Sequence, residues 1–181
     1  MRILVASDIH GRLHRMEAFN VWIDKLNPER IILLGDYLYN GPRNGVPDDY
    51  NPMEVSKLLN MNAQRIIGVR GNCDSRIDDT LLDFKLEDNR SIELDGMKFE
   101  LYHGDDFSLR NLKKEKGHIL LSGHTHIYVL KEEDGIVYLN PGSISFPKNM
   151  NPPSFALIED GEAQIIDFDN GSVLKKLPIL S

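Results

Sequence analysis

Cysteine is scarce in this sequence, and basic residues are fewer than acidic ones. Cys73 is the single cysteine among 181 residues, so the chain cannot form an internal disulfide, and we expect a reducing compartment, the cytoplasm. Lysine and arginine together number 21 against 28 aspartates and glutamates, which gives a net charge of −7. Proteins that bind polymeric nucleic acid usually present a basic surface, so this balance argues against such a partner. A small phosphorylated substrate stays compatible, because bound metal ions reverse the local sign of the field.

Long apolar runs are absent as well. The run from Ile3 to Ala6 is too short for a signal peptide, and no stretch approaches the roughly 20 apolar residues of a membrane-spanning helix. No repeat, linker or low-complexity segment interrupts the chain. We therefore expect no membrane association and a single soluble domain over residues 1–181.

The first part of the chain alternates short apolar runs with segments of helical periodicity. Buried strands are predicted at Ile3 to Ala6, Ile31 to Leu34 and Arg65 to Val69. Helices are predicted from Leu13 to Leu26, before an Asn-Pro pair, and from Met53 to Met61. This order indicates a β-α-β-α-β unit.

The second part of the chain is predicted to be mainly β-structure. A hairpin is expected around Asp95-Gly96, and a polar helix over Phe107 to Lys116 precedes a strand from His118 to Leu121. Five further short strands are expected between Tyr128 and Leu177, separated by Asp-Gly, Asn-Gly and Pro-rich turns. The two parts together indicate an α/β protein with two packed sheets and helices on the outside.

Five of the predicted strands end in a glycine beside aspartate, histidine or asparagine. In open α/β sheets, sites form at the carboxyl ends of the strands, so clusters at successive strand ends converge on one place. The clusters are Asp8-Ile9-His10-Gly11, Gly35-Asp36, Gly71-Asn72-Cys73-Asp74, His103-Gly104 and Gly123-His124-Thr125-His126.

Each cluster taken alone has an ordinary structural explanation. A Gly-Asp pair after a strand is common in turns, and His103 alone would be a buried structural histidine. The joint pattern resists that explanation, because four of the six histidines fall at glycine-marked strand ends. The other two, His14 and His118, lie within predicted elements, and we expect structural or surface roles for them.

The side chains in these clusters offer oxygen and imidazole ligands to metal ions. We expect Mn²⁺, with Ni²⁺, Zn²⁺, Fe or Mg²⁺ as alternatives, rather than Ca²⁺, which prefers oxygen ligands alone. Seven ligands are too many for one ion, whereas two ions that share a carboxylate leave positions for water and substrate and can clamp a phosphorus centre. The expected ligands are Asp8, His10, Asp36, Asn72, His103, His124 and His126.

The ordered set Asp-x-His, Gly-Asp, Gly-Asn, His-Gly and Gly-His-x-His resembles the signature of the calcineurin-like metallophosphoesterase superfamily. The segments Arg70 to Asp74, Asn40 to Asn44 and Asn140 to Ser143 are similar to those of the small bacterial phosphodiesterases of the YfcE type. The resemblance implies a four-layer α/β/β/α sandwich, two mixed sheets flanked by helices.

The same resemblance implies a division of the ligands and a reaction. One ion would be held by Asp8, His10, Asp36 and His126, and the other by Asp36, Asn72, His103 and His124, with Asp36 bridging. A hydroxide bridging the two ions would attack a small phosphodiester without a covalent enzyme intermediate.

Cys73 is a departure from the superfamily pattern. The resemblance places a histidine at this position, where it helps the leaving group or the transition state, and Asp74 can orient that histidine. A thiol is a poor general acid compared with imidazolium, so we expect phosphodiesters or activated esters to be preferred over alkyl monoesters. Cys73 and Asp74 are thus the candidate catalytic residues beside the metal ligands; packing or metal-adjacent roles for Cys73 stay open.

Several expectations have alternatives. A scaffold protein that keeps the fold, as the retromer subunit does, is the competing function, although none of the ligands is missing here. Within the loop from Tyr39 to Pro52, Asn40 or Arg43 could contact substrate or simply be solvated. The Asn140 to Ser143 segment is either a structural turn or a support for His124 and His126. We expect a homodimer or homotetramer.

Overall fold

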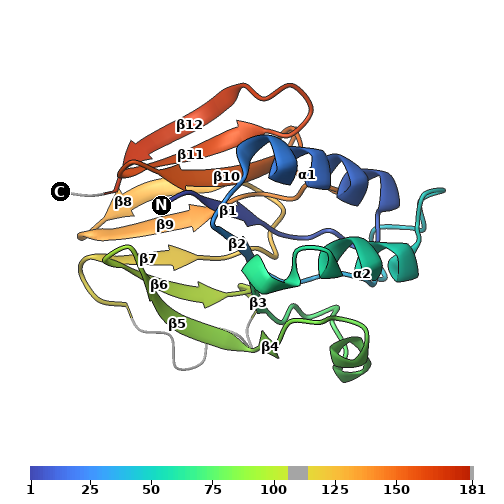
Figure 1. Cartoon of the computed structure of the whole chain (residues 1–181). Helices are drawn as coiled ribbons and strands as arrows, with labels where there is room; N and C mark the ends of the chain where they lie inside the picture. Colours follow the sequence, from blue (N-terminus) through green and yellow to red (C-terminus); the bar gives the residue numbers. More distant parts are fainter. Residues whose placement is uncertain (106–113, 180–181) are drawn as a thin grey trace.

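The computed structural model describes residues 1–105 and 114–179, and they form two packed β-sheets with helices on one outer face (Figure 1). The elements in chain order are β1 (Ile3–Ala6), α1 (Leu13–Leu26), β2 (Arg30–Leu33), α2 (Pro52–Asn60), η1 (Ala63–Arg65), β3 (Ile66–Val69), η2 (Arg76–Thr80), β4 (Leu86–Glu87), β5 (Asn89–Leu94), β6 (Met97–Tyr102), β7 (His118–Leu121), β8 (Val129–Glu133), β9 (Ile136–Asn140), β10 (Ser154–Glu159), β11 (Glu162–Asp167) and β12 (Val173–Pro178), where η marks a 3₁₀ turn.

Both sheets are mixed. The first has seven strands in the order β12-β11-β10-β1-β2-β3-β4, and the second has five in the order β5-β6-β7-β9-β8. In the first sheet β1, β2, β3 and β4 run parallel, while β10, β11 and β12 complete it with antiparallel pairs. In the second sheet β6, β7 and β9 are parallel, and β5 and β8 pair antiparallel at the two edges. The mixed α/β arrangement expected from the sequence is confirmed.

Alternating side chains of the first sheet supply two separate cores. Leu4, Ala6 and Leu33 pack beneath the helices together with Phe19 of α1, and all four are fully or almost fully buried. The residues in between, such as Val5 and Ile32, face the second sheet and pack between the two sheets. Strands with both faces covered are continuous apolar runs in the sequence, which is why these strands could be predicted.

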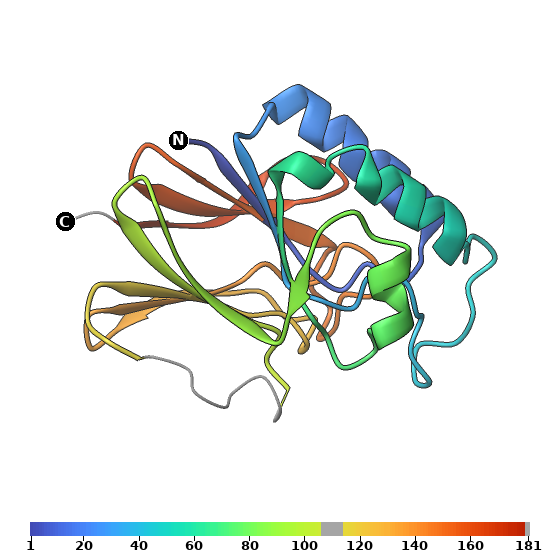
Figure 2. The same ribbon diagram turned by 60° about the horizontal axis from the view of Figure 1, so that its bottom comes forward.

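Helices α1 and α2 lie side by side on the outer face of the first sheet (Figures 1 and 2). The buried face of α1 carries Met16, Phe19 and Ile23 at helical spacing, and Asn27 ends the helix in a left-handed conformation with φ of 44°. The second helix begins at Pro52 after Asn51, whose side chain accepts a hydrogen bond from the Glu54 amide. Among the described residues, no helix has the length and apolarity that a membrane crossing requires.

The outer face of the second sheet carries the buried side chains Tyr102, Leu120 and Ile136. The helix predicted over Phe107 to Lys116 lies outside the described residues except for its last three positions, which are not helical. The short strand β4 was not anticipated, since two residues are too few for a periodic pattern.

Candidate dinuclear metal centre

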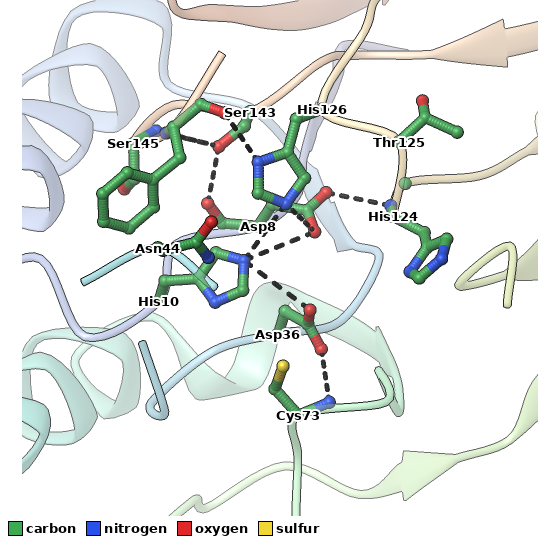
Figure 3. A network of polar contacts seen from close by, with 12 residues as sticks. Asp8, His10, Asp36, Asn44, Cys73, His124, Thr125, His126, Ser143 and Ser145 are labelled. Carbon is green, nitrogen blue, oxygen red and sulfur yellow. Dashed lines mark hydrogen bonds and ion pairs between the residues drawn. The ribbon is translucent and has the colours of Figure 1, made fainter. Parts of the chain in front are cut away.

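Seven polar side chains from five strand ends meet at one edge of the two sheets. The first sheet contributes residues that follow β1, β2 and β3, and the second contributes residues that follow β6 and β7. Figure 3 shows Asp8, His10, Asp36 and His126 pointing toward one another. The structure therefore brings together every ligand candidate of the sequence: Asp8, His10, Asp36, Asn72, His103, His124 and His126.

One group of ligand atoms gathers around Asp8. The Nε2 atoms of His10 and His126 lie 3.2 Å apart, and Asp8 Oδ1 lies 3.7 Å from the first and 3.3 Å from the second. All three side chains are almost completely buried. The spacing is that of donor atoms arranged around a common centre, and the three residues form a candidate metal-ligand group.

A second group of ligand atoms gathers around His103. Its Nε2 lies 3.0 Å from Asn72 Oδ1 and 3.2 Å from His124 Nδ1. Asp36 joins the two groups, because its Oδ2 atom is 3.5 Å from His103 Nε2 and 3.6 Å from His10 Nε2. One carboxylate oxygen thus lies between two sets of ligand atoms, which is the geometry of a bridging ligand.

Backbone carbonyls fix the orientation of three of the histidines. The Nδ1–H groups of His10, His103 and His126 donate to the carbonyl oxygens of Tyr39, Leu34 and Phe146, at 2.9, 2.6 and 2.6 Å. Each ring then turns its Nε2 atom to the site, which is how metal-binding imidazoles are usually held. No residue type marks a carbonyl acceptor, so the sequence could not reveal these three supports.

The centre has more hydrogen-bond acceptors than hydrogen-bond donors. Asp8 Oδ1 is buried and accepts no hydrogen bond from any described residue, although an unpaired buried carboxylate oxygen is costly. It faces the Nε2 atoms of His10 and His126. Divalent cations satisfy such a set of carboxylate and imidazole donors, so the residues fit the ions that the sequence implied.

The pKa values of the side chains in the centre are shifted by this excess of acceptors and by burial. Burial alone would lower the pKa of His103, but the hydrogen bond to Asp36 and the charges of Asp8 and Asp36 raise it to about 9. Burial would raise the pKa of Asp36, yet His103 and His10 lower it to about 2. Burial lowers the pKa of His10 and of His124, which keeps both rings neutral. In the protein without ions, a proton on His103 takes the place of a cation beside Asp36.

Backbone strain concentrates at the centre. Five of the seven ligand candidates have left-handed φ angles between 54° and 66°, a region that non-glycine residues rarely adopt: Asp8, His10, Asp36, His124 and His126. Such residues cost of the order of 1 kcal/mol each and persist where the surrounding structure imposes them. Strain of this kind gathered at one cluster of polar residues is typical of a functional site.

Two glycines allow the close approaches within the centre. A Cβ atom on Gly71 would lie 2.2 Å from Asp36 Oδ1, and one on Gly123 would lie 2.0 Å from Ser7 Oγ. Any side chain at either position would therefore displace the strand ends that carry Asp36 and Asp8.

Asp74 lies directly beneath Asp36 and binds backbone groups. Its carboxylate accepts the amides of Asp36, Tyr37 and Gly71 at 2.7–2.8 Å. Burial and the nearby charge of Asp36 raise the pKa of Asp74 to about 7, against the lowering effect of these three hydrogen bonds. The contacts tie the ends of β2 and β3 together, so Asp74 acts on the centre by positioning Asp36.

Cys73 lies at the wall of the centre, half-buried. Its amide donates to Asp36 Oδ1 at 2.8 Å, and burial together with the charge of Asp36 raises the pKa of the thiol to about 12. The side chain is therefore a neutral thiol at physiological pH.

His14 and His118, which the sequence assigned to other roles, lie away from the centre, on α1 and on β7.

The segment after β9 supports the residues that follow β1 and β7. Asn140 donates to the Gly123 carbonyl at 2.6 Å, and Ser143 Oγ donates to the Asp8 carbonyl at 2.8 Å. Ser145 Oγ, which the sequence analysis did not single out, donates to the Ile9 carbonyl at 2.7 Å. The turn from Asn140 to Ser143 thus contacts the backbone of ligand-bearing segments. The alternation of small polar residues at 143 and 145 was the available signal.

Replacing Ser143 with alanine is expected to lower the free energy of unfolding by about 2–3 kcal/mol. Ser143 is fully buried, and its hydroxyl also accepts the amides of Ser145 and Phe146, so three backbone groups lose their partner. Because one of these groups is the Asp8 carbonyl, divalent-metal binding should also weaken by about 10–100-fold. Urea unfolding and a chelator competition titration measure the two effects.

The matched control is Ser56→Ala. Ser56 is also buried, but its hydroxyl donates to the Met53 carbonyl within α2, where alanine is a better helix former. We expect that variant to keep wild-type stability and metal affinity. Equal behaviour of the two variants would show that Ser143 does not support the centre.

The chain is similar to known proteins over most of its length. Residues 1–162 match the sequence model of the calcineurin-like phosphoesterase superfamily domain. Phosphodiesterase YfcE of Escherichia coli K12 is 35% identical over 181 residues, which cover 99% of this chain and 98% of that protein. Phosphodiesterase MJ0936 of Methanocaldococcus jannaschii is 28% identical over 152 residues, 78% of this chain and 83% of that protein.

Solved structures give the same grouping. The structure of YfcE, a phosphoesterase from E. coli, superposes with a TM-score of 0.94 and covers 99% of this chain and 100% of that one, at 35% identity. A Vps29 variant from Entamoeba histolytica superposes with a TM-score of 0.60 at 27% identity, covering 98% of each chain.

Proposed function

The chain belongs to the calcineurin-like phosphoesterase superfamily, and from this premise we propose that it is a metal-dependent phosphodiesterase that hydrolyses a small phosphodiester. The observation that carries the proposal is the position of Asp36 Oδ2 between two sets of ligand atoms, 3.6 Å from His10 and 3.5 Å from His103. A carboxylate shared by two ions fits a two-metal site, which can clamp the attacking and leaving oxygens of an in-line displacement at phosphorus.

Two divalent ions would divide the seven ligands along the two groups seen in the structure. The first would be held by Asp8, His10, His126 and Asp36, and the second by Asp36 and the remaining three: Asn72, His103 and His124. When bound, the ions polarise the phosphate and lower the pKa of the water that attacks phosphorus. We propose Mn²⁺ as the physiological metal, since the mixed oxygen and nitrogen ligands suit it.

The chain's own residues then decide the type of ester. Asp36 and Asp8 set the charge of the centre, and the carbonyl-bound imidazoles hold their donor atoms in place without moving. A thiol is a poor general acid compared with imidazolium, and in the protein without ions burial and the charge of Asp36 raise the pKa of Cys73 further, to about 12. We therefore propose that phosphodiesters and activated esters are preferred over alkyl monoesters.

A scaffold role is the alternative function. Vps29 shares the fold at a TM-score of 0.60, whereas YfcE superposes at 0.94 over essentially the whole chain. All seven ligand candidates are also present here and lie together. Both observations favour the enzyme.

Metal removal and return test the proposed function. Protein stripped with a chelator should show no hydrolysis of bis-p-nitrophenyl phosphate, and added Mn²⁺ should restore it, with much slower cleavage of p-nitrophenyl phosphate. The reason is that the two ions would bind the attacking water and lower its pKa, which the ligand side chains do not do by themselves. Absence of activity with Mn²⁺, Ni²⁺, Zn²⁺ and Mg²⁺ alike would contradict the enzyme and favour the scaffold.

The setting of the enzyme is a further part of the proposal. We propose one functional domain over residues 1–181 that works in the cytoplasm, where the half-buried thiol of Cys73 beside the centre stays reduced. Both sheets have open edges among the described strands, which supports a homodimer or homotetramer. Light scattering on the purified protein measures that state.

A further inference from the structure

The hollow at the metal centre is too small for a whole substrate. Its volume is about 130 Å³, below the roughly 300 Å³ of the smallest ordinary ligand pockets. A phosphate group fills most of such a space. Groups esterified to that phosphate must therefore lie over the rim of the hollow, and the rim residues are the ones able to select them.

Two cationic side chains, Arg43 and Lys148, line this hollow at its rim. Both are exposed, and neither forms a hydrogen bond or an ion pair through its side chain with any residue in the described ranges 1–105 and 114–179. Several other arginines among the described residues are neutralised by carboxylates, as Arg2 is by Glu159 and Arg70 by Asp79. We call Arg43 and Lys148 the cationic rim.

The backbone at both rim positions is fixed. The Lys148 amide donates to the carbonyl of His126 at 3.1 Å, so the backbone of Lys148 is bound directly to that of a candidate ligand. Arg43 stands in a loop closed by two contacts, from the Asn40 side chain to the Gly45 carbonyl and from the Asn44 side chain to the Asn40 carbonyl. Asn40 is thus turned into the loop and buried, and Figure 3 places Asn44 beside His10.

The positive charge of the rim is more than a singly charged diester needs. Two divalent ions, the carboxylates of Asp8 and Asp36, a hydroxide nucleophile and a singly charged diester together sum to a neutral assembly. Asp36 is the one carboxylate among the described residues that line the hollow. The chain has a net charge of −7, yet these two cations at the rim form no ion pair with any described residue.

We propose that the cationic rim binds a second phosphate group of the substrate, so that the preferred substrates are phosphodiesters that carry a terminal phosphate on one of the esterified groups. A terminal phosphate bears close to two negative charges and three acceptor oxygens, which match a guanidinium and an ammonium from two separate loops. A carboxylate, with one charge, is satisfied by a single bidentate arginine. This inference rests on the proposed function and names the substrate class of the same site.

A matched pair of substrates tests the inference. Both are thymidines with p-nitrophenyl phosphate on the 5′ oxygen, and one carries an additional phosphate on the 3′ oxygen, so the same bond breaks in each. We expect the additional phosphate to raise kcat/KM of the wild type by about tenfold or more, since exposed charge pairs contribute about threefold to tenfold per cation. The advantage should shrink in high salt.

The rim variants should remove that advantage. Lys148→Gln and Arg43→Gln are each expected to lower the ratio of the two kcat/KM values by about threefold to tenfold, and Lys148→Glu should lower it further. Lys175→Gln is the matched control, because Lys175 is exposed on β12 and its loss changes the net charge equally. Equilibrium binding of thymidine 3′,5′-bisphosphate, compared with thymidine 5′-phosphate, should show the same pattern without turnover.

The outcomes separate the two proposals. Bis-p-nitrophenyl phosphate has no second phosphate, so its metal-dependent hydrolysis by the wild type reports the proposed function alone. If that hydrolysis is present, a ratio near one in the wild type, or a ratio that both glutamine variants leave unchanged, overturns the rim inference only. If it is absent with every metal, the proposed function is overturned and the rim inference with it.

Discussion

Replacing Asp36 with asparagine is expected to lower kcat for bis-p-nitrophenyl phosphate by about a thousandfold or more. Removal of a shared charged ligand forfeits several kcal/mol of transition-state stabilisation, at about 1.4 kcal/mol for each factor of ten. The asparagine side chain keeps the shape and one oxygen, but it lacks the charge that lies between His10 and His103. Steady-state kinetics and metal analysis of the variant measure the effect, and the metal content should fall from two ions per chain to one or fewer.

Folding of the Asp36→Asn variant should survive. The charge of Asp36 is stabilised by His103 and His10, so its removal costs some stability in the protein without ions, and relief of repulsion with Asp74 and Asp8 offsets part of that cost. Asp24→Asn provides the control, because Asp24 is exposed on α1, far along the chain from the strand ends. A folded Asp36→Asn protein that keeps two ions and full activity would show that Asp36 is no bridge.

The strand ends could be read from the sequence because burial and chemistry coincide there. β1 and β2 are apolar runs covered on both faces, and each gives way abruptly to polar residues. All seven ligand candidates were therefore identified before their proximity was known. The boundary of α2 was off by one residue, because Pro52 occupies the first turn once Asn51 caps the helix.

The supports of the site were largely hidden. The carbonyl groups of Leu34, Tyr39 and Phe146 orient three histidines, yet any residue could supply a carbonyl oxygen. Lys148 is a similar case, since an exposed lysine in a Pro-rich loop is ordinary until its amide is seen to bind His126. Such features depend on contacts between distant segments, and the left-handed angles of the ligand residues likewise follow from the fold rather than from local preference.

Replacing Cys73 with histidine is expected to raise hydrolysis of an unactivated monoester, phenyl phosphate, by about 100-fold, the lower end of the usual range for general acid catalysis. The neutral thiol with a pKa of about 12 gives no proton at neutral pH, whereas imidazolium does. Bis-p-nitrophenyl phosphate has a good leaving group and should gain little. Phosphate release from phenyl phosphate and nitrophenol release from the diester measure the change in their ratio.

The surroundings of Cys73 limit how well the new imidazole can act. Both oxygens of Asp74 already accept backbone amides, so this carboxylate has little acceptor capacity left to orient a histidine at position 73 as the superfamily pattern implies. A Cβ atom added at Gly41 would lie only 3.4 Å from Cys73 Sγ. Because Gly41 has no side chain, it leaves space into which the imidazole of a histidine at position 73 can turn.

The pH profile and a serine variant identify the mechanism of any gain. Imidazolium is the active acid, so the gain should be greatest below the ordinary histidine pKa of about 6.5 and decline as the pH rises through it. Cys73→Ser has the size of the native residue and no usable acid, and it should gain nothing. An unchanged ratio of diester to monoester hydrolysis in Cys73→His, or an equal gain in Cys73→Ser, would contradict the claim that the missing acid sets the preference for diesters. A gain confined to the histidine variant at low pH would instead mean that a single position beside the bridging carboxylate selects the class of ester.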